Sequence, residues 1–156
     1  ILSKSIKMNT TLANMSGISN GKVIDTDKEY AVAEEYRKKL KTKCPTVEQN
    51  VGNLSGGNQQ KVLLAKWMFA EPDILILDEP TRGIDVGAKY EIYCIINDLV
   101  AAGKSVIMIS SELPEVLGMS DRIYIMNEGR FVGEVSGEEA TSELIMSRIV
   151  KSGKGE

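Results

Sequence analysis

Short apolar runs alternate with helical patterns through the middle of the chain. Residues 74–77 and 106–109 are continuous apolar runs, which are typical of parallel strands buried on both faces. Between them, apolar residues at helical spacing over residues 92–99 predict a helix, and Gly103 is expected to end it. A strand, a helix and a second strand in this order predict an α/β core with parallel strands.

A helical portion precedes this core. Residues 1–25 are polar and mixed, without a clear period. Asp27 is predicted to cap a helix that runs to about Lys43. Ser55 is a favourable N-cap for a second helix that continues through Met68.

The last third of the chain predicts a hairpin and a helix. Residues 123–126 and 131–135 are expected to pair around a turn at 127–130. A final amphipathic helix is predicted to begin at Ser136 or Ser142.

Composition narrows the chemistry. The 156 residues carry a net charge of −3, and this slight acidity argues against a dedicated nucleic-acid binder. The absence of histidine excludes histidine metal sites and Ser-His triads from this sequence. No apolar run approaches the roughly 18–20 residues that cross a bilayer. Cys44 and Cys94 are expected to be reduced thiols, with Cys94 packed in the core.

The first candidate site is the acidic pair that follows the run at 74–77. Asp78 and Glu79 would stand at the carboxyl end of a buried strand, where ligands of open α/β sheets gather, and this is a Walker-B pattern. Asp78 is expected to hold Mg²⁺ through a water molecule, and Glu79 to orient or deprotonate a water that attacks a phosphate. Taken alone, the pattern also describes a strand that ends in a solvated acidic turn.

The second candidate site opens the helix predicted after Ser55. Free N–H groups and the positive end of the helix dipole form an anion site, and glycine allows close approach to a phosphate. The Ser55 hydroxyl can donate to a phosphate oxygen. The residues of this segment are Leu54, Ser55, Gly56, Gly57, Asn58 and Gln59.

Both segments, in this order and spacing, resemble the signature motif and Walker B of ABC-type ATPases, and residues 81–85 resemble the D-loop. Residues 79–89 and 110–123 are similar to the second nucleotide-binding half of bacterial monosaccharide importers of the ribose, galactose and xylose type. The resemblance is strong over residues 44–136.

The resemblance implies a fold and a domain division. The expected fold is a partial P-loop NTPase (RecA-like) core with parallel strands and a helical subdomain, from which the P-loop strand is missing. Residues 1–53 would belong to the helical subdomain, 54–136 to the signature helix and the ATPase core, and 137–156 to a C-terminal helix and tail.

Two departures from the family pattern affect the expected activity. Ser111 stands where the family carries a histidine that contacts the terminal phosphate, so the hydrolytic site of this half is expected to be impaired. No P-loop is found: Gly103, Lys104 and Ser105 follow a helix, and Asp98 stands where the upstream glycine belongs. We therefore expect the chain to begin after the Q-loop and to be inactive alone.

Loss of the P-loop strand would open edges on 104–109 and 121–127, which favours self-association.

The family also implies ligands and partners. ATP and Mg²⁺ would be the cofactors, with residues 54–59 and Asp85 contacting ATP held by the other nucleotide-binding half. A membrane permease would be the direct partner and a sugar-binding protein an indirect one, at the cytoplasmic face of a bacterial membrane, without nucleic acid. Two alternatives remain open: a soluble ABC protein that acts on ribosomes or DNA, and a non-enzymatic interaction fragment.

Overall fold

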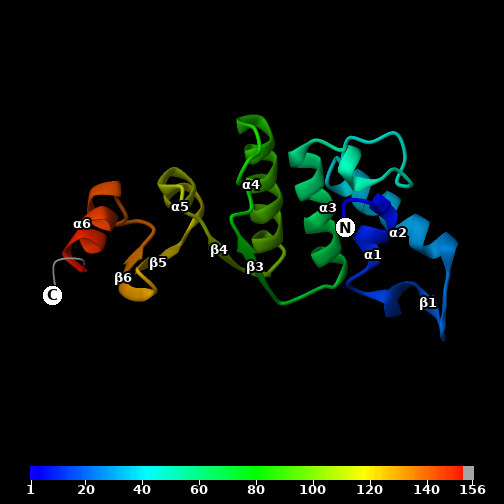
Figure 1. Cartoon of the computed structure of the whole chain (residues 1–156). Helices are drawn as coiled ribbons and strands as arrows, with labels where there is room; N and C mark the ends of the chain where they lie inside the picture. Colours follow the sequence, from blue (N-terminus) through cyan, green and yellow to red (C-terminus); the bar gives the residue numbers. More distant parts are fainter. Residues whose placement is uncertain (153–156) are drawn as a thin grey trace. The chain divides into compact units, whose positions relative to one another are not determined.

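Helices prevail in the first part of the chain, and strands alternate with helices from β3 to β5 (Figure 1). The computed structural model describes residues 1–152, which fall into two compact units, one spanning Ile1–Ile107 and one beginning at Met108. In chain order the elements are α1 (Ile6–Thr11), η1 (Met15–Ile18), β1 (Ser19–Asn20), β2 (Val23–Ile24), α2 (Thr26–Lys39), η2 (Val51–Asn53), α3 (Gly56–Phe69), β3 (Ile74–Asp78), α4 (Val86–Ala101), β4 (Ser105–Ile109), α5 (Leu113–Met119), β5 (Arg122–Asn127), β6 (Arg130–Ser136) and α6 (Ser142–Ser152).

The predicted α/β core is confirmed. Strands β3 and β4 form a two-stranded parallel sheet, joined through α4. Helix α4 ends as expected at a glycine, because Gly103 adopts a φ of 85°, which residues with a side chain rarely adopt. The backbone N–H of Gly103 donates to the carbonyl of Val100 at 2.9 Å, which closes the last turn.

The prediction that these strands are buried on both faces is wrong. Successive side chains of a strand point to opposite faces of a sheet. In β3, Leu75 and Leu77 are buried, whereas Ile74 and Ile76 are 58% and 63% exposed. Residues within the described part of the chain therefore cover only one face of β3.

Strands β4 and β5, which were expected to lie on either side of the missing P-loop strand, have the open edges that the sequence predicts. Strand β4 pairs with β3, and β5 pairs with β6 in a separate sheet. Within residues 1–152, β4 and β5 do not share a sheet, so each offers backbone groups on an edge.

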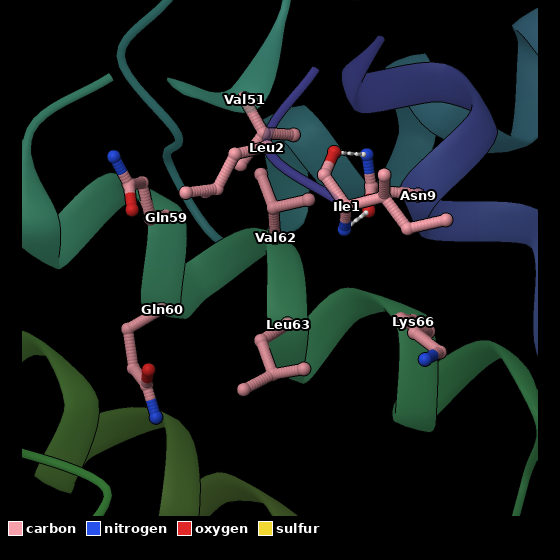
Figure 2. A pocket seen from close by; sticks show the side chains of 9 residues that line it. All are labelled: Ile1, Leu2, Asn9, Val51, Gln59, Gln60, Val62, Leu63 and Lys66. Atoms are coloured by element: carbon pink, nitrogen blue, oxygen red, sulfur yellow. Dashed lines mark hydrogen bonds between the residues drawn. The ribbon is translucent and has the colours of Figure 1, made fainter. Parts of the chain in front are cut away.

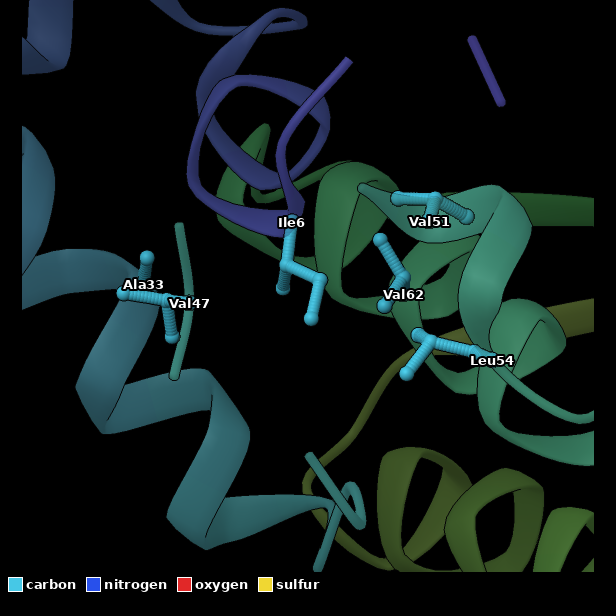
Figure 3. Close-up of a cluster of buried hydrophobic side chains, with 6 residues drawn as sticks. All are labelled: Ile6, Ala33, Val47, Val51, Leu54 and Val62. Carbon is cyan, nitrogen blue, oxygen red and sulfur yellow. The ribbon is translucent and has the colours of Figure 1, made fainter. Parts of the chain in front are cut away.

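The helical part of the first unit packs around one apolar cluster (Figure 3). Helix α1, which the sequence pattern did not predict, packs against both α2 and α3. The six buried side chains come from three helices and from the segment between α2 and α3: Ile6, Ala33, Val47, Val51, Leu54 and Val62.

Helix α2 lies close to its predicted range but has another cap. Asp25, not Asp27, is the N-cap, and its carboxylate accepts the backbone N–H groups of Asp27 and Lys28 at 3.2 and 3.0 Å. These hydrogen bonds, led by that from Lys28, lower the pKa of Asp25. The helix ends at Lys39, earlier than expected, because Lys41 adopts a φ of 51°.

The second unit contains the predicted hairpin and final helix. Strands β5 and β6 pair antiparallel, with a register irregularity between Ile125 and Met126. Helix α6 begins at Ser142, one of the two predicted starts, and the Thr141 hydroxyl accepts the N–H of Leu144 at 3.1 Å. Ile123, Ile125, Val135 and Ile145 form the buried cluster between the hairpin and α6.

The cysteines are both free thiols. Burial raises the pKa of Cys44, which packs against the cluster of the first unit. The predicted core position of Cys94 is wrong, because α4 turns Ile92, Ile95 and Ile96 inward and leaves Cys94 exposed.

Candidate functional site at the starts of two helices

Helix α3 begins where the signature segment begins. Ser55 is its N-cap, as predicted, in an extended conformation with φ −62° and ψ 156°. Its hydroxyl does not cap the helix; it instead accepts a hydrogen bond from Nδ2 of Asn58 at 2.9 Å. Because the Ser55 side chain makes no capping hydrogen bond, the first-turn N–H groups of α3 remain suited to an anion.

Helix α4 begins at the predicted D-loop residue. Asp85 is its N-cap, and its Oδ1 accepts the backbone N–H of Ala88 at 2.9 Å. The start of α3 lies against it at van der Waals distance. A Cβ atom added at Gly57 would lie 2.5 Å from the Cβ of Ala88, and one added at Gly56 would lie 3.2 Å from Ile84. The two glycines are thus required for close packing of the signature against the D-loop.

These two helix starts border one hollow of about 300 Å³. The fold therefore brings three predicted signature residues together with the predicted D-loop aspartate. Its lining residues are Lys43, Ser55, Gly57, Asn58, Asp85, Gly87, Ala88 and Glu91.

A buried lysine joins α3 to Glu91 of α4, which lines this hollow. The Lys61 side chain is 3% exposed, and its Nζ lies 2.8 Å from Oε2 of Glu91, which is 48% exposed. The same Nζ donates to the backbone carbonyl of Lys41 at 3.2 Å. Lys61 follows Gly57 by four residues, so both face α4. Lys61 was not predicted as a site residue, although a lysine among apolar residues on one helix face was the available signal.

The ion pair gives a pH-dependent contribution to stability. The hydrogen bond from Lys61, together with its charge, holds the pKa of Glu91 below its ordinary value, against the opposing effect of burial. A carboxyl group whose pKa is lowered by folding stabilises the folded state above its unfolded pKa, and this contribution is lost as the pH falls through the folded value.

We expect the substitution Glu91→Gln to destabilise the chain at pH 6 by about 1 kcal/mol, a small value because Glu91 is half exposed. The difference between the two proteins should shrink toward zero as the pH falls from about 5 to about 3. Urea unfolding of both proteins across this range measures it. A difference that stays constant with pH would show that the Glu91 charge contributes nothing.

Two of the predicted signature residues lie elsewhere. Leu54 belongs to the apolar cluster of the first unit. Gln59 donates through Nε2 to the carbonyl of Leu54 at 2.9 Å and lines a second hollow of about 220 Å³, together with Asn9, Val62 and Gln60 (Figure 2). That hollow is separate from the one that contains Ser55 and Asp85.

The acidic pair stands at the end of β3, as the sequence predicts. Asp78 is the last residue of the strand and is exposed. Glu79 adopts a φ of 47°, which costs a non-glycine residue energy and often marks a functional position. Neither residue lines the hollow at the helix starts. The signature and the acidic pair therefore form two separate candidate sites.

Ser111 lies in the second unit, directly after β4, and is exposed. The neighbouring Ser110 donates its hydroxyl to the buried carboxylate of Glu115 on α5 and accepts the N–H of Glu112 at 3.0 Å. These bonds fix the turn that carries Ser111.

Residues 1–152 contain no group of three or more Cys, Asp or Glu side chains placed to hold a metal. In the same range, every helix is too short or too polar to cross a membrane.

The sequence profile of the ABC transporter family matches residues 3–82, about half of the chain, including the signature and the acidic pair. The chain belongs to the ABC transporter family. Its curated relatives are longer proteins, and it spans about 30% of their length.

Three of these relatives are ATP-binding proteins named for sugar transport. The chain is 61% identical over 152 residues to the L-arabinose transport ATP-binding protein of Geobacillus stearothermophilus. The matched region makes up 97% of this chain and 30% of that protein. The chain is 56% identical over 147 residues to the xylose import ATP-binding protein of Geobacillus kaustophilus, covering 94% and 29%. It is 55% identical over 151 residues to the ribose import ATP-binding protein of Clostridium perfringens, covering 96% and 30%.

Solved structures agree on the fold. The chain superposes with a TM-score of 0.79 on a metal-chelate-type ABC transporter in an inward-facing conformation, at 18% identity, covering 96% of this chain and 59% of that chain. A dimeric ATP-binding cassette bound to ADP and phosphate gives a TM-score of 0.72 at 22% identity, covering 87% and 58%. The predicted partial nucleotide-binding fold is therefore confirmed.

Proposed function

We propose that this chain is part of the ATP-binding subunit of a bacterial importer of monosaccharides. The observation that carries the proposal is the convergence of Ser55, Gly57, Asn58 and Asp85 on one hollow at the starts of α3 and α4. The identities of 55–61% to proteins named for arabinose, xylose and ribose transport support the substrate class.

The hollow suits part of a nucleotide. The uncapped start of α3 offers N–H groups and a positive dipole end to an anion, and Lys43 adds a positive charge at the rim. Ser55 would donate its hydroxyl to a phosphate oxygen, and Gly57 brings the α3 backbone close to α4. In the proposed assembly, Ser55, Gly57, Asn58 and Asp85 line the side of the hollow that faces ATP held by the other nucleotide-binding half, whereas Leu54 and Gln59 of the predicted signature lie outside it.

The acidic pair would serve a second ATP, held with Mg²⁺ by this half itself. Bound ATP would supply the phosphoryl group, and Asp78 would hold its Mg²⁺ through a water molecule. Glu79 would orient or deprotonate the attacking water. Ser111, whose side chain cannot act as imidazole does, would leave this centre weak.

The proposed partners follow from the substrate class. A membrane permease would contact the helical subdomain, residues 1–53, and a sugar-binding protein would deliver the sugar to the permease. The subunit would be peripheral, at the cytoplasmic face of the membrane. The net charge of −3 does not favour the first alternative, a soluble ABC protein that binds ribosomes or DNA. The second alternative, a non-enzymatic interaction fragment, gains no support from relatives that are named as ATP-binding proteins.

The experiment compares the isolated 156-residue chain with the whole subunit by release of inorganic phosphate from ATP. We expect turnover from the whole subunit and none from the chain, because the chain has no P-loop to wrap the phosphates. The same reaction mixture without protein provides the background rate. Turnover by the purified chain at the rate of the whole subunit would contradict the proposal.

A further inference from the structure

The Asn58 side chain is bonded at both ends. Its Oδ1 accepts the backbone N–H of Lys43 at 2.9 Å, and its Nδ2 donates to the hydroxyl oxygen of Ser55 at 2.9 Å. A backbone N–H can only donate, so Lys43 fixes which end of the amide is oxygen. The nitrogen end must therefore face Ser55.

This contact determines what the Ser55 hydroxyl can do. A serine hydroxyl has one O–H donor and two acceptor lone pairs. Because Asn58 donates to one lone pair, the hydroxyl proton cannot be directed at Asn58 and remains available for an acceptor elsewhere. Ser55 lines the hollow at the helix starts, where an anionic oxygen would be such an acceptor.

The loop after α2 holds the oxygen end of the Asn58 side chain. Lys43 bonds Asn58 through its N–H, and two residues earlier the Lys41 carbonyl accepts from the buried Lys61. The loop is thus attached to α3 at two points. Asn58 is consequently fixed from the side of the helical subdomain as well as from its own helix.

We infer that Asn58 is a positioning residue that holds the Ser55 hydroxyl as a donor toward the nucleotide, rather than a residue that contacts the nucleotide itself. The inference rests on the proposed function, which supplies the anionic acceptor. Its support is that both ends of the Asn58 amide are already occupied by Lys43 and Ser55.

The substitution Asn58→Asp isolates this role. The new carboxylate keeps an acceptor for the Lys43 N–H but replaces the donor to Ser55 by a second acceptor, so the Ser55 hydroxyl would donate to this carboxylate in place of the nucleotide. An acidic residue in the first turn of a helix is favourable, so α3 should be retained. An unchanged thermal midpoint of the whole subunit checks this.

The test is a double-mutant cycle in the whole subunit, measuring ATP turnover of Asn58→Asp, Ser55→Ala and the double substitution. In the protein that retains Ser55, we expect Asn58→Asp to lower turnover about tenfold. In the Ser55→Ala protein it should have no effect, because the hydroxyl on which it acts is then absent. An equal loss in both backgrounds would overturn the inference, since charge or direct contact would then explain it. The inference would also be overturned if Asn58→Asp caused no loss of turnover in the protein that retains Ser55. Full activity of Ser55→Ala would instead contradict the proposed role of the signature.

Discussion

Replacing Gly57 with alanine is expected to lower ATP turnover of the whole subunit about 100-fold, since a displacement of about 1 Å at a reacting group has this effect. The added Cβ would lie 2.5 Å from that of Ala88, so α3 and α4 must separate at their starts. That separation widens the hollow that both Ser55 and Asp85 line. Overpacking should also destabilise the fold by about 1–3 kcal/mol.

Two matched variants control this prediction. Ala88→Gly combined with Gly57→Ala removes the clash and should restore most of the turnover, at a cost of about 1 kcal/mol in helix stability. Gly118→Ala adds the same methyl group in α5, where nothing lies within 4 Å, and should leave turnover unchanged. Equal losses from Gly57→Ala with and without Ala88→Gly would contradict the packing argument.

Replacing Ser55 with alanine should lower turnover of the whole subunit by about 100-fold, the loss typical when one donor to a developing negative charge is removed. Stability should fall by no more than about 1 kcal/mol, because the Ser55 side chain does not cap α3 and only accepts one exposed hydrogen bond, from Asn58. Steady-state phosphate release and a thermal melt measure the two effects.

Ser147→Ala is the control for this substitution. The Ser147 hydroxyl donates to the Leu144 carbonyl of its own helix at 2.8 Å, so its loss should leave turnover unchanged. If Ser55→Ala melts far below the wild-type protein, loss of structure would explain its inactivity and the role assigned to the hydroxyl would be contradicted.

Much of the fold could be predicted because local chemistry determined it. The strand at 74–78, the glycine that ends α4 and the hairpin of β5 and β6 all follow from period and turn residues. Helix α1 was missed because only Ile6 of its residues joins the apolar cluster, and so short a segment shows no period.

The candidate site was predictable in its residues but not in its arrangement. The glycine-rich helix start indicated Ser55, and the resemblance to the D-loop implied Asp85. The fit of Gly57 against Ala88 and the Lys61–Glu91 pair depend on how α3 and α4 pack. The exposed face of β3 could not be foreseen for a similar reason. An apolar run has the same sequence whether one face or both faces of its sheet are covered.

The central claim is that the signature of this half serves the ATP of the other half, while its own acidic pair contributes little to hydrolysis. The most direct measurement compares ATP turnover of whole subunits that carry Ser55→Ala or Glu79→Gln. We predict a loss of about 100-fold for Ser55→Ala. For Glu79→Gln we predict turnover within about twofold of the wild-type protein, because the centre that contains Ser111 is already weak. A large loss from Glu79→Gln with a small one from Ser55→Ala would contradict the account.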